Sequence, residues 1–176
     1  MTELKAAIVS PLEILEKKIV YVEGGELILS GDENQMQQCG IDLRLAKAYS
    51  VSGPTEFFVS KKSIKPDLLP LAISDNCYLF KAGQQYALDF VEDISVPEDM
   101  AAMIINRSTI NRFSGTISSG VYDPGFRSKD GCGAVYRPTR DTKIEIGFRM
   151  AQVVFYTAKS ASLYSGQYQD SKEKVK

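Results

Sequence analysis

The sequence predicts a mainly β domain, and three observations support this prediction. Short segments rich in β-branched and aromatic residues recur along the chain, and clusters of Gly, Pro, Asn or Asp bound them. The segment 41–45 alternates apolar and polar residues strictly, which is the period of a half-buried strand. Many short strands at close spacing are typical of an all-β barrel or jelly roll. The expected strands include residues 26–29, 41–45, 78–80, 86–90, 101–105 and 153–156.

A short amphipathic helix is expected near the N-terminus, over residues 10–19. Ser10 and Glu13 are spaced as a capping box, and Pro11 occupies the favoured first helical position. Apolar residues at spacings of three and four then give one face that packs on the domain. The members of this face are Leu12, Leu15 and Ile19. A second helical turn is expected at Ser108–Phe113, with the serine as its cap.

The chain has 176 residues, which is the length of one domain with a tail. We expect a single β domain over residues 1–160 and a mobile, polar C-terminal segment over 161–176. Residues 60–76 carry two prolines and are expected as a long surface excursion. With 21 Lys and Arg against 22 Asp and Glu, the net charge of −1 argues against general nucleic-acid binding.

Membrane and redox signals point to a cytoplasmic protein. No apolar run approaches the roughly 20 residues that cross a bilayer, so no membrane partner is expected. The three cysteines, Cys39, Cys77 and Cys132, form no C-x-x-C pair. Their odd number and wide spacing argue against a disulfide framework or a zinc ribbon, and fit ordinary thiols in a reducing compartment.

The most restrictive absence is histidine, of which the chain has none. This excludes Ser-His-Asp and Cys-His nucleophilic machinery and HExxH metallohydrolases. It also excludes the zinc deaminase site, which needs a histidine beside paired cysteines. Acid–base chemistry in this chain would fall to carboxylates, lysine, tyrosine or bound water.

Residues 106–112, NRSTINR, combine an apolar strand end with hydroxyls and two arginines. Backbone N–H groups at a helix start, with the hydroxyls of Ser108 and Thr109, can hold an anion. Arg107 and Arg112 add positive charge in a geometry suited to phosphate. The alternative interpretation is a helix cap beside two solvated arginines.

Residues 120–127, GVYDPGFR, contain the strongest turn signal in the chain. Proline and glycine after Asp123 favour a type II turn, which would place this aspartate at a strand end. There it could deprotonate a water in a site without histidine, or it could merely initiate the turn. Residues 163–169, LYSGQYQ, could close over a ligand or be a disordered end with incidental aromatics. On the strand 40–45, Asp42 and Arg44 share one face and are expected to face water, the alternative being an interfacial ion pair or an approach to a ligand.

Taken together and in order, these segments resemble the motifs of the dCTP deaminase and trimeric dUTPase superfamily. Gly40–Leu45 is similar to the first motif of that superfamily, and Arg107–Arg112 to the second. Gly120–Arg127 resembles the third motif, and Gly147–Gln152 the fourth. Tyr164–Gln169 resembles the C-terminal tail of the deaminase branch.

The resemblance implies a fold, an assembly and a ligand. The fold would be a distorted, jelly-roll-like β-barrel with a short N-terminal helix and a helical turn after the second motif. Subunits would form a homotrimer with active sites between them. The ligand would be a pyrimidine deoxynucleoside triphosphate, dUTP or dCTP, with Mg²⁺ held by the phosphates and water rather than by side chains.

The resemblance also implies a role for individual residues. Asp123 would activate the catalytic water. The phosphates would be bound by Arg107, Ser108, Thr109 and Arg112. The base and sugar would be contacted by Ile117, Ser118, Ser119, Tyr122 and Phe126. The lid over the ligand would comprise Tyr164, Gln167 and Tyr168.

One departure from the family pattern decides between activities. Deaminases of this superfamily resemble one another in a glutamate shortly after the third motif. The corresponding position here is Gly133, or Tyr136 if residues 127–131 hold an insertion, and no acid occurs between Asp130 and Asp141. The resemblance therefore favours a dUTP diphosphatase.

Two alternatives remain open at this point. The first is a dCTP deaminase, yielding dUTP or dUMP, in which Glu145 or a tyrosine shuttles protons. The second is a nucleotide-binding homologue without catalysis.

Overall fold

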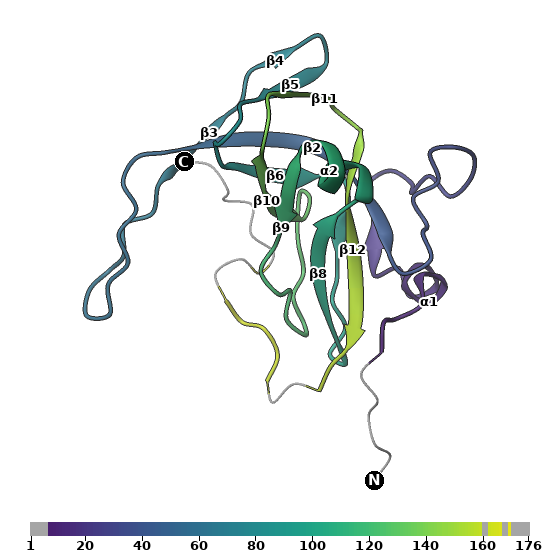
Figure 1. The fold of residues 1–176 in the computed structure, drawn as a ribbon. Helices are drawn as coiled ribbons and strands as arrows, with labels where there is room; N and C mark the ends of the chain where they lie inside the picture. The colour runs from purple at the N-terminus through teal and green to yellow at the C-terminus, as the bar shows by residue number, and fades with distance from the viewer. Residues whose placement is uncertain (1–6, 160–161, 167–168, 170–176) are drawn as a thin grey trace.

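The computed structural model describes residues 7–159, 162–166 and 169. Its centre is a seven-stranded sheet in the order β12-β8-β9-β10-β6-β2-β3, and an additional β12–β2 pairing closes six of these strands into a barrel (Figure 1). The predicted fold class is therefore confirmed. The barrel strands are β2 (Ile41–Ser52), β6 (Tyr86–Phe90), β8 (Met100–Asn106), β9 (Gly115–Ser118), β10 (Gly133–Pro138) and β12 (Arg149–Thr157).

Smaller elements surround the barrel. β3 (Asp67–Pro70) extends the sheet beside β2, and β1 (Val20–Tyr21) pairs with β7 (Asp93–Ile94). A three-stranded sheet comprises β11 (Thr142–Glu145), β5 (Cys77–Phe80) and β4 (Ile73–Ser74). The two helices among the described residues are α1 (Pro11–Glu16) and α2 (Ser108–Phe113).

The barrel interior is filled by apolar side chains that alternate with outward-facing ones along the strands. Phe80 packs edge-on against the rings of Tyr86 and Tyr136, at centroid distances of 5.0 and 5.1 Å. Edge-to-face pairs of this kind add roughly 1 kcal/mol each beyond the area they bury. The fully buried core also includes Leu43, Leu45, Phe90, Ile104, Val153 and Phe155.

Helix α1 is shorter than predicted and buries a different face. It ends at Glu16, and its buried residues are Pro11 and Ile14 rather than Leu12, which is 61% exposed. Ser10 caps the helix by accepting from the Leu12 N–H at 3.3 Å, as expected. The other half of the predicted capping box is replaced, because the Glu13 carboxylate pairs with Lys17.

The predicted strand at 26–29 is wrong, because these residues lie in a loop that runs to residue 37. Ile28 and Leu29 are exposed and do not pack on the core. Their preference for β-structure is therefore not enough to form a strand. Gln35 instead holds the loop: its backbone N–H donates to the Ile28 carbonyl at 2.7 Å. Its side-chain oxygen accepts from the Ile28 N–H at 2.9 Å. This loop covers one end of β2, which shapes the site described below.

The predicted excursion at 60–76 is surface-exposed but not wholly irregular. Its second half forms β3, which pairs with β2 through Tyr49 opposite Pro70. Proline lacks a backbone donor, so it fits the outermost strand of a sheet. Because β3 is the last strand in the order, Pro70 leaves the barrel pairing intact.

Candidate functional site

The candidate phosphate-binding residues lie where β8 turns into α2. Asn106, the last residue of β8, donates to the Gly115 carbonyl at 3.0 Å and accepts from the Ile117 N–H at 3.2 Å. These bonds fasten the start of β9 to the strand before the helix. As a result Ser108, Thr109 and Arg112 are exposed together on the short helix.

The cap of α2 differs from the prediction. The N-cap is Arg107, and Ser108 is the first helical residue. No side chain makes a cap hydrogen bond to this helix. Ser108 therefore does not cap the helix, and its side chain is exposed.

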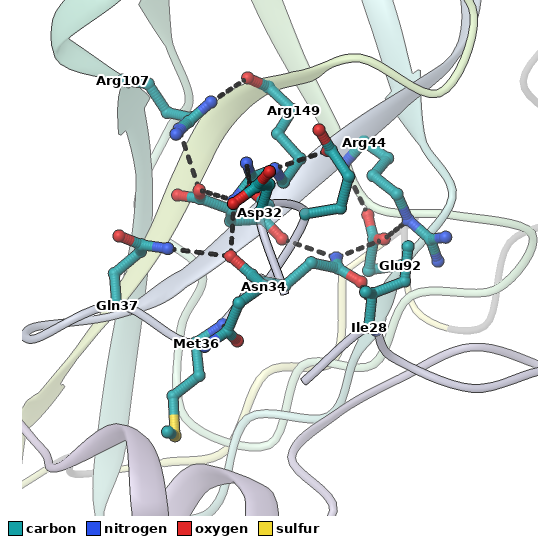
Figure 2. Close-up of polar contacts among 12 residues, drawn as sticks. Ile28, Asp32, Asn34, Met36, Gln37, Arg44, Glu92, Arg107 and Arg149 are labelled. Atoms are coloured by element: carbon teal, nitrogen blue, oxygen red, sulfur yellow. Dashed lines mark hydrogen bonds and ion pairs between the residues drawn. The ribbon is translucent and has the colours of Figure 1, made fainter. Parts of the chain in front are cut away.

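Arg107 is not the solvated arginine that the alternative interpretation expected. Its Nε forms an ion pair with Asp42 Oδ2 at 2.8 Å, and its Nη1 donates to the Arg149 carbonyl at 2.8 Å. About a quarter of the side chain, 25%, stays exposed. Figure 2 shows Arg107 directed toward Arg149 on β12. The second and fourth sequence motifs thus meet in space.

Asp42 is the largest error in the sequence prediction for the site. It was expected to face water, yet its side chain is only 1% exposed. Its Oδ2 accepts from Arg149 Nη1 at 3.3 Å in addition to the Arg107 pair, whereas its Oδ1 is buried and has no hydrogen-bond partner among the described residues. Burial raises the pKa of this carboxyl to about 6, although Arg107 and Arg149 oppose the shift; Glu92 adds to it.

The guanidinium of Arg149 is enclosed by the loop that covers β2 (Figure 2). Its Nη2 donates to the Asp32 carbonyl at 2.6 Å, its Nη1 donates to the Asn34 carbonyl, and its Nε pairs with Glu33 at 3.0 Å. Only 11% of the side chain is exposed. Arg149 is therefore bound within the protein and is not placed for a ligand.

A second buried carboxylate anchors the same loop. Glu92 is fully buried and accepts from the Arg44 N–H at 2.8 Å, from Arg44 Nε at 2.7 Å and from Gln35 Nε2 at 2.8 Å. Figure 2 shows this group beside Arg149. Arg44 is thus also turned to an internal partner instead of facing water. Three donors thus hydrogen-bond to the Glu92 carboxylate, as a buried charge requires.

The predicted turn at Asp123 is confirmed. Gly125 has φ of +83°, and the Phe126 N–H donates to the Asp123 carbonyl at 3.0 Å, as in a type II turn. An added Cβ at Gly125 would lie 3.1 Å from the Leu163 Cβ, so the position also needs glycine for space. The turn leaves Asp123 exposed at the end of the Tyr122 bridge to Ala102.

Aromatic rings pack beside the turn that carries Asp123. Phe126, 8% exposed, packs against Tyr122 at 4.9 Å and against Tyr164 at 5.4 Å between ring centroids. The Tyr122 hydroxyl donates to the Gly133 carbonyl and accepts from the Gly133 N–H at 3.2 Å. Burial raises the pKa of this hydroxyl, so it stays protonated and holds its hydrogen bond.

The described part of the C-terminal segment lies against the same turn. The Tyr164 N–H donates to the Pro124 carbonyl at 2.8 Å. Gln169, which the sequence analysis did not select, donates to the Gly125 carbonyl at 2.9 Å and accepts from the Arg127 N–H at 3.0 Å. The predicted lid residues Gln167 and Tyr168 lie outside the described residues.

The candidate base-binding residues lie along β9 and the turn after it. Ile117 is buried, whereas Ser118 is exposed and its hydroxyl accepts from Arg137 Nη1 at 3.3 Å. The Ser119 hydroxyl accepts from the Ile104 N–H at 2.9 Å. Arg137 was not selected from the sequence, because only the pairing of β9 with β10 brings it beside Ser118.

The structure separates Asp123 from the phosphate-binding candidates within one chain. Tyr122 bridges to Ala102 in β8, whereas Arg107 follows the far end of that strand. At about 3.3 Å per residue, the five residues from Ala102 to Arg107 span roughly 16 Å. A water-activating carboxylate must lie within one water of the phosphate under attack, so one subunit does not assemble both parts of the site.

The two positions that correspond to the deaminase glutamate hold no acid. Gly133 faces the Tyr122 hydroxyl, and Tyr136 is fully buried with its own hydroxyl 2.9 Å from Ser114 Oγ. Glu145 lies on β11 and lines, with Thr109, a cavity of about 210 Å³ against α2. That places it at the α2 end of β8, away from the Asp123 turn.

No group of three or more His, Cys, Asp or Glu among the described residues is arranged to hold a metal ion. Within the same residues, none of the helices has the length and apolar character to span a membrane.

The chain thus combines a closed β-barrel with an exposed aspartate on a tight turn and a separate cluster of hydroxyls and arginines, and it contains no histidine. A family model described as dCTP deaminase-like matches residues 15–158. The chain therefore belongs to the dCTP deaminase-like family.

Individual relatives match over most of the chain. A deoxyuridine 5′-triphosphate nucleotidohydrolase of Methanocaldococcus jannaschii is 30% identical over 141 residues, covering 78% of this chain and 88% of the relative. A probable enzyme of the same name from Methanopyrus kandleri is 29% identical over 137 residues, covering 78% and 89%.

Among solved structures, the 2′-deoxycytidine 5′-triphosphate deaminase of Agrobacterium tumefaciens matches with a TM-score of 0.61 at 18% identity. The match covers 87% of this chain but only 48% of that chain, so this chain spans about half the length of the solved one. The likeness concerns the fold.

Proposed function

We propose that this protein is a dUTP diphosphatase, which converts dUTP and water to dUMP and diphosphate. The observation that carries the proposal is Asp123: an exposed carboxylate on a rigid turn, in a chain without histidine and without an acid at either deaminase position. The archaeal relatives named deoxyuridine 5′-triphosphate nucleotidohydrolases, which match over most of both chains, support the same activity.

In the proposed reaction Asp123 accepts a proton from the attacking water as the water adds to a phosphate. The exposed hydroxyls of Ser108 and Thr109 donate to phosphate oxygens, while Arg107 and Arg112 offset the charge that develops there. Phosphate oxygens carry more negative charge as the bond to diphosphate breaks, so these donors stabilise the transition state more than the bound substrate.

The base and sugar would bind along β9 and the turn after it. Backbone groups around Ile117–Ser119 would face the base edge, and the rings of Tyr122 and Phe126 would lie beneath the sugar. The lid would comprise Tyr164, Gln167 and Tyr168. The contacts of Tyr164 with Pro124 and Phe126 support a tail that reaches the turn carrying the catalytic aspartate.

Magnesium fits this proposal as a companion of the substrate. The ion would be carried by the triphosphate and water, as the family resemblance implies. When bound, Mg²⁺ neutralises charge on the phosphate oxygens.

We further propose that the active site forms between subunits of a homotrimer. The separation of roughly 16 Å along β8 supports this arrangement, because the aspartate turn of one subunit can then meet the hydroxyls and arginines of its neighbour. Head-to-tail contacts of this kind close into rings.

A second candidate is dCTP deamination, which the dCTP deaminase-like family match favours. It would need a proton shuttle other than the family glutamate, and Tyr136 is buried while Glu145 lies at the α2 end. The product distinguishes the two: deamination of dCTP gives dUTP or dUMP, whereas the diphosphatase leaves dCTP intact.

The test is product analysis after incubation with Mg²⁺ and either dUTP or dCTP. We expect dUMP and diphosphate from dUTP, no turnover of dCTP, and loss of hydrolysis in Asp123→Asn. Conversion of dCTP would establish the second candidate. Tight nucleotide binding without turnover of either substrate would refute both and identify a nucleotide-binding homologue.

A further inference from the structure

We infer that Asp42 is a positioning residue, which fixes the guanidinium of Arg107 beside α2 and thereby sets the affinity for the triphosphate. The inference rests on the proposed function in taking Arg107 as a phosphate contact. The contacts of Asp42 itself are independent of that function. They connect three segments that are far apart in sequence: β2, the turn before α2, and β12.

The geometry fixes Arg107 at two points. Asp42 Oδ2 lies 2.8 Å from Arg107 Nε, and the Arg149 carbonyl accepts from Arg107 Nη1 at 2.8 Å. A planar guanidinium bound at two of its nitrogens has a defined orientation. The exposed quarter of the side chain then meets a ligand without first losing rotamer freedom, which preserves binding free energy.

The burial of Asp42 argues against a purely stabilising role. Its Oδ1 is buried without a partner among the described residues, and burial raises the pKa of the carboxyl despite two neighbouring arginines. Burial therefore makes the charged form of this side chain less stable than it is in water, and the charge is retained at a cost to the stability of the fold. A costly buried carboxylate directed at arginines is expected where the position of the arginines matters.

The two arginines depend on Asp42 to different extents. Arg149 keeps three further acceptors without it: the carbonyls of Asp32 and Asn34 and the carboxylate of Glu33. Arg107 would keep only the carbonyl bond among the described residues. The loss of the Asp42 charge should therefore release Arg107 and leave Arg149 in place.

This asymmetry provides a matched control. Glu33 pairs with Arg149 but is 68% exposed, and the ion pair and hydrogen bond of Arg107 in the described part of the chain go to Asp42 and Arg149 instead. Asp42→Asn removes the charge that holds Arg107 with almost no change in side-chain volume. Glu33→Gln removes a charge of the same sign from the same network without affecting Arg107.

The experiment measures the affinity of each variant for a non-hydrolysable imido analogue of dUTP with Mg²⁺, by calorimetry, together with melting temperature. We expect Asp42→Asn to weaken binding by about tenfold, the effect of one charge-assisted contact, without a lower melting temperature. Glu33→Gln should bind within about twofold of the wild type, as exposed pairs contribute little.

A double-mutant cycle shows whether Asp42 acts through Arg107. Arg107→Ala should weaken binding, and adding Asp42→Asn to it should cause no further loss, because the residue being positioned is gone. Wild-type affinity in Asp42→Asn, or losses that add in the double variant, would overturn the inference.

A different result would refute the proposed function. Absence of dUTP hydrolysis by the wild type, with binding of the analogue retained, would refute the diphosphatase and leave this cycle interpretable.

Discussion

Replacing Asp42 with asparagine should change how the stability of the fold depends on pH. In the folded protein the pKa of Asp42 is raised from 3.8 to about 6, chiefly by burial. The folded state therefore binds a proton on Asp42 more tightly than the unfolded chain does. The wild type should lose stability as the pH rises through the window between these two values, and the contribution should level off above pH 6.

The magnitude follows from the size of the shift. Each pH unit between the two pKa values corresponds to about 1.4 kcal/mol. The interval from 3.8 to about 6 therefore corresponds to a penalty on the order of 3 kcal/mol at neutral pH. Asparagine does not titrate, so the stability of Asp42→Asn relative to the wild type should rise by most of this amount as the pH is raised from 4 to 7.

The assay is urea unfolding of both proteins at several pH values, with the difference in unfolding free energy plotted against pH. Taking the difference removes the titration of all other carboxylates that the two proteins share. A difference independent of pH would refute the reasoning. A difference of opposite sign would show that the arginines, rather than burial, dominate the environment of Asp42.

Three further predictions concern other residues of the site. Asp123→Asn should lower kcat for dUTP by at least about a hundredfold, measured by diphosphate release, while the affinity for the imido analogue stays within a few fold. Glu92→Gln should destabilise the fold by about 3 kcal/mol in urea unfolding, because it leaves Arg44 with a neutral buried partner; an unchanged midpoint would contradict the network described here. Gly125→Ala should lower the melting temperature, at a cost of roughly 1–3 kcal/mol, because φ is +83° and the new Cβ would press on Leu163; wild-type stability would show that the turn can relax.

Local chemistry accounts for the elements that the sequence predicted well. The strands around 41–45, 86–90, 101–105 and 153–156 carry residues that suit a pleated, half-buried surface, and all four lie in barrel strands. The Asp-Pro-Gly turn is equally local, since proline and glycine constrain the backbone at their own positions.

The errors arise where partners come from distant parts of the chain. The alternation along 41–45 predicted a solvent-exposed face for Asp42, but the loop that ends at residue 37 covers that face. The local sequence pattern does not predict that a distant loop covers the strand. Residue spacing likewise did not indicate that Arg107 turns inward, because its partners lie on β2 and β12. Asn106 and Arg137 were not predicted as site residues, because only strand pairing brings them beside the site.

The sequence predicted which kinds of residues make up the candidate site, but not how they are arranged in space. The sequence identified Asp123 and the hydroxyl and arginine cluster as separate motifs, and the resemblance placed them in one site between subunits. Within one chain the barrel sets them at opposite ends of β8, since β9 and the following turn run antiparallel beside that strand. The proposed shared site would therefore need a second chain.

Complementation between two inactive variants tests the central claim most directly. Asp123→Asn chains and Ser108→Ala/Arg112→Ala chains would be coexpressed with different tags, and the mixed oligomers would be isolated and assayed for dUMP production. If each site takes Asp123 from one subunit and the phosphate-binding residues from its neighbour, each mixed trimer keeps one intact site of its three and restores about a third of the activity. Mixed oligomers as inactive as either parent would contradict the account.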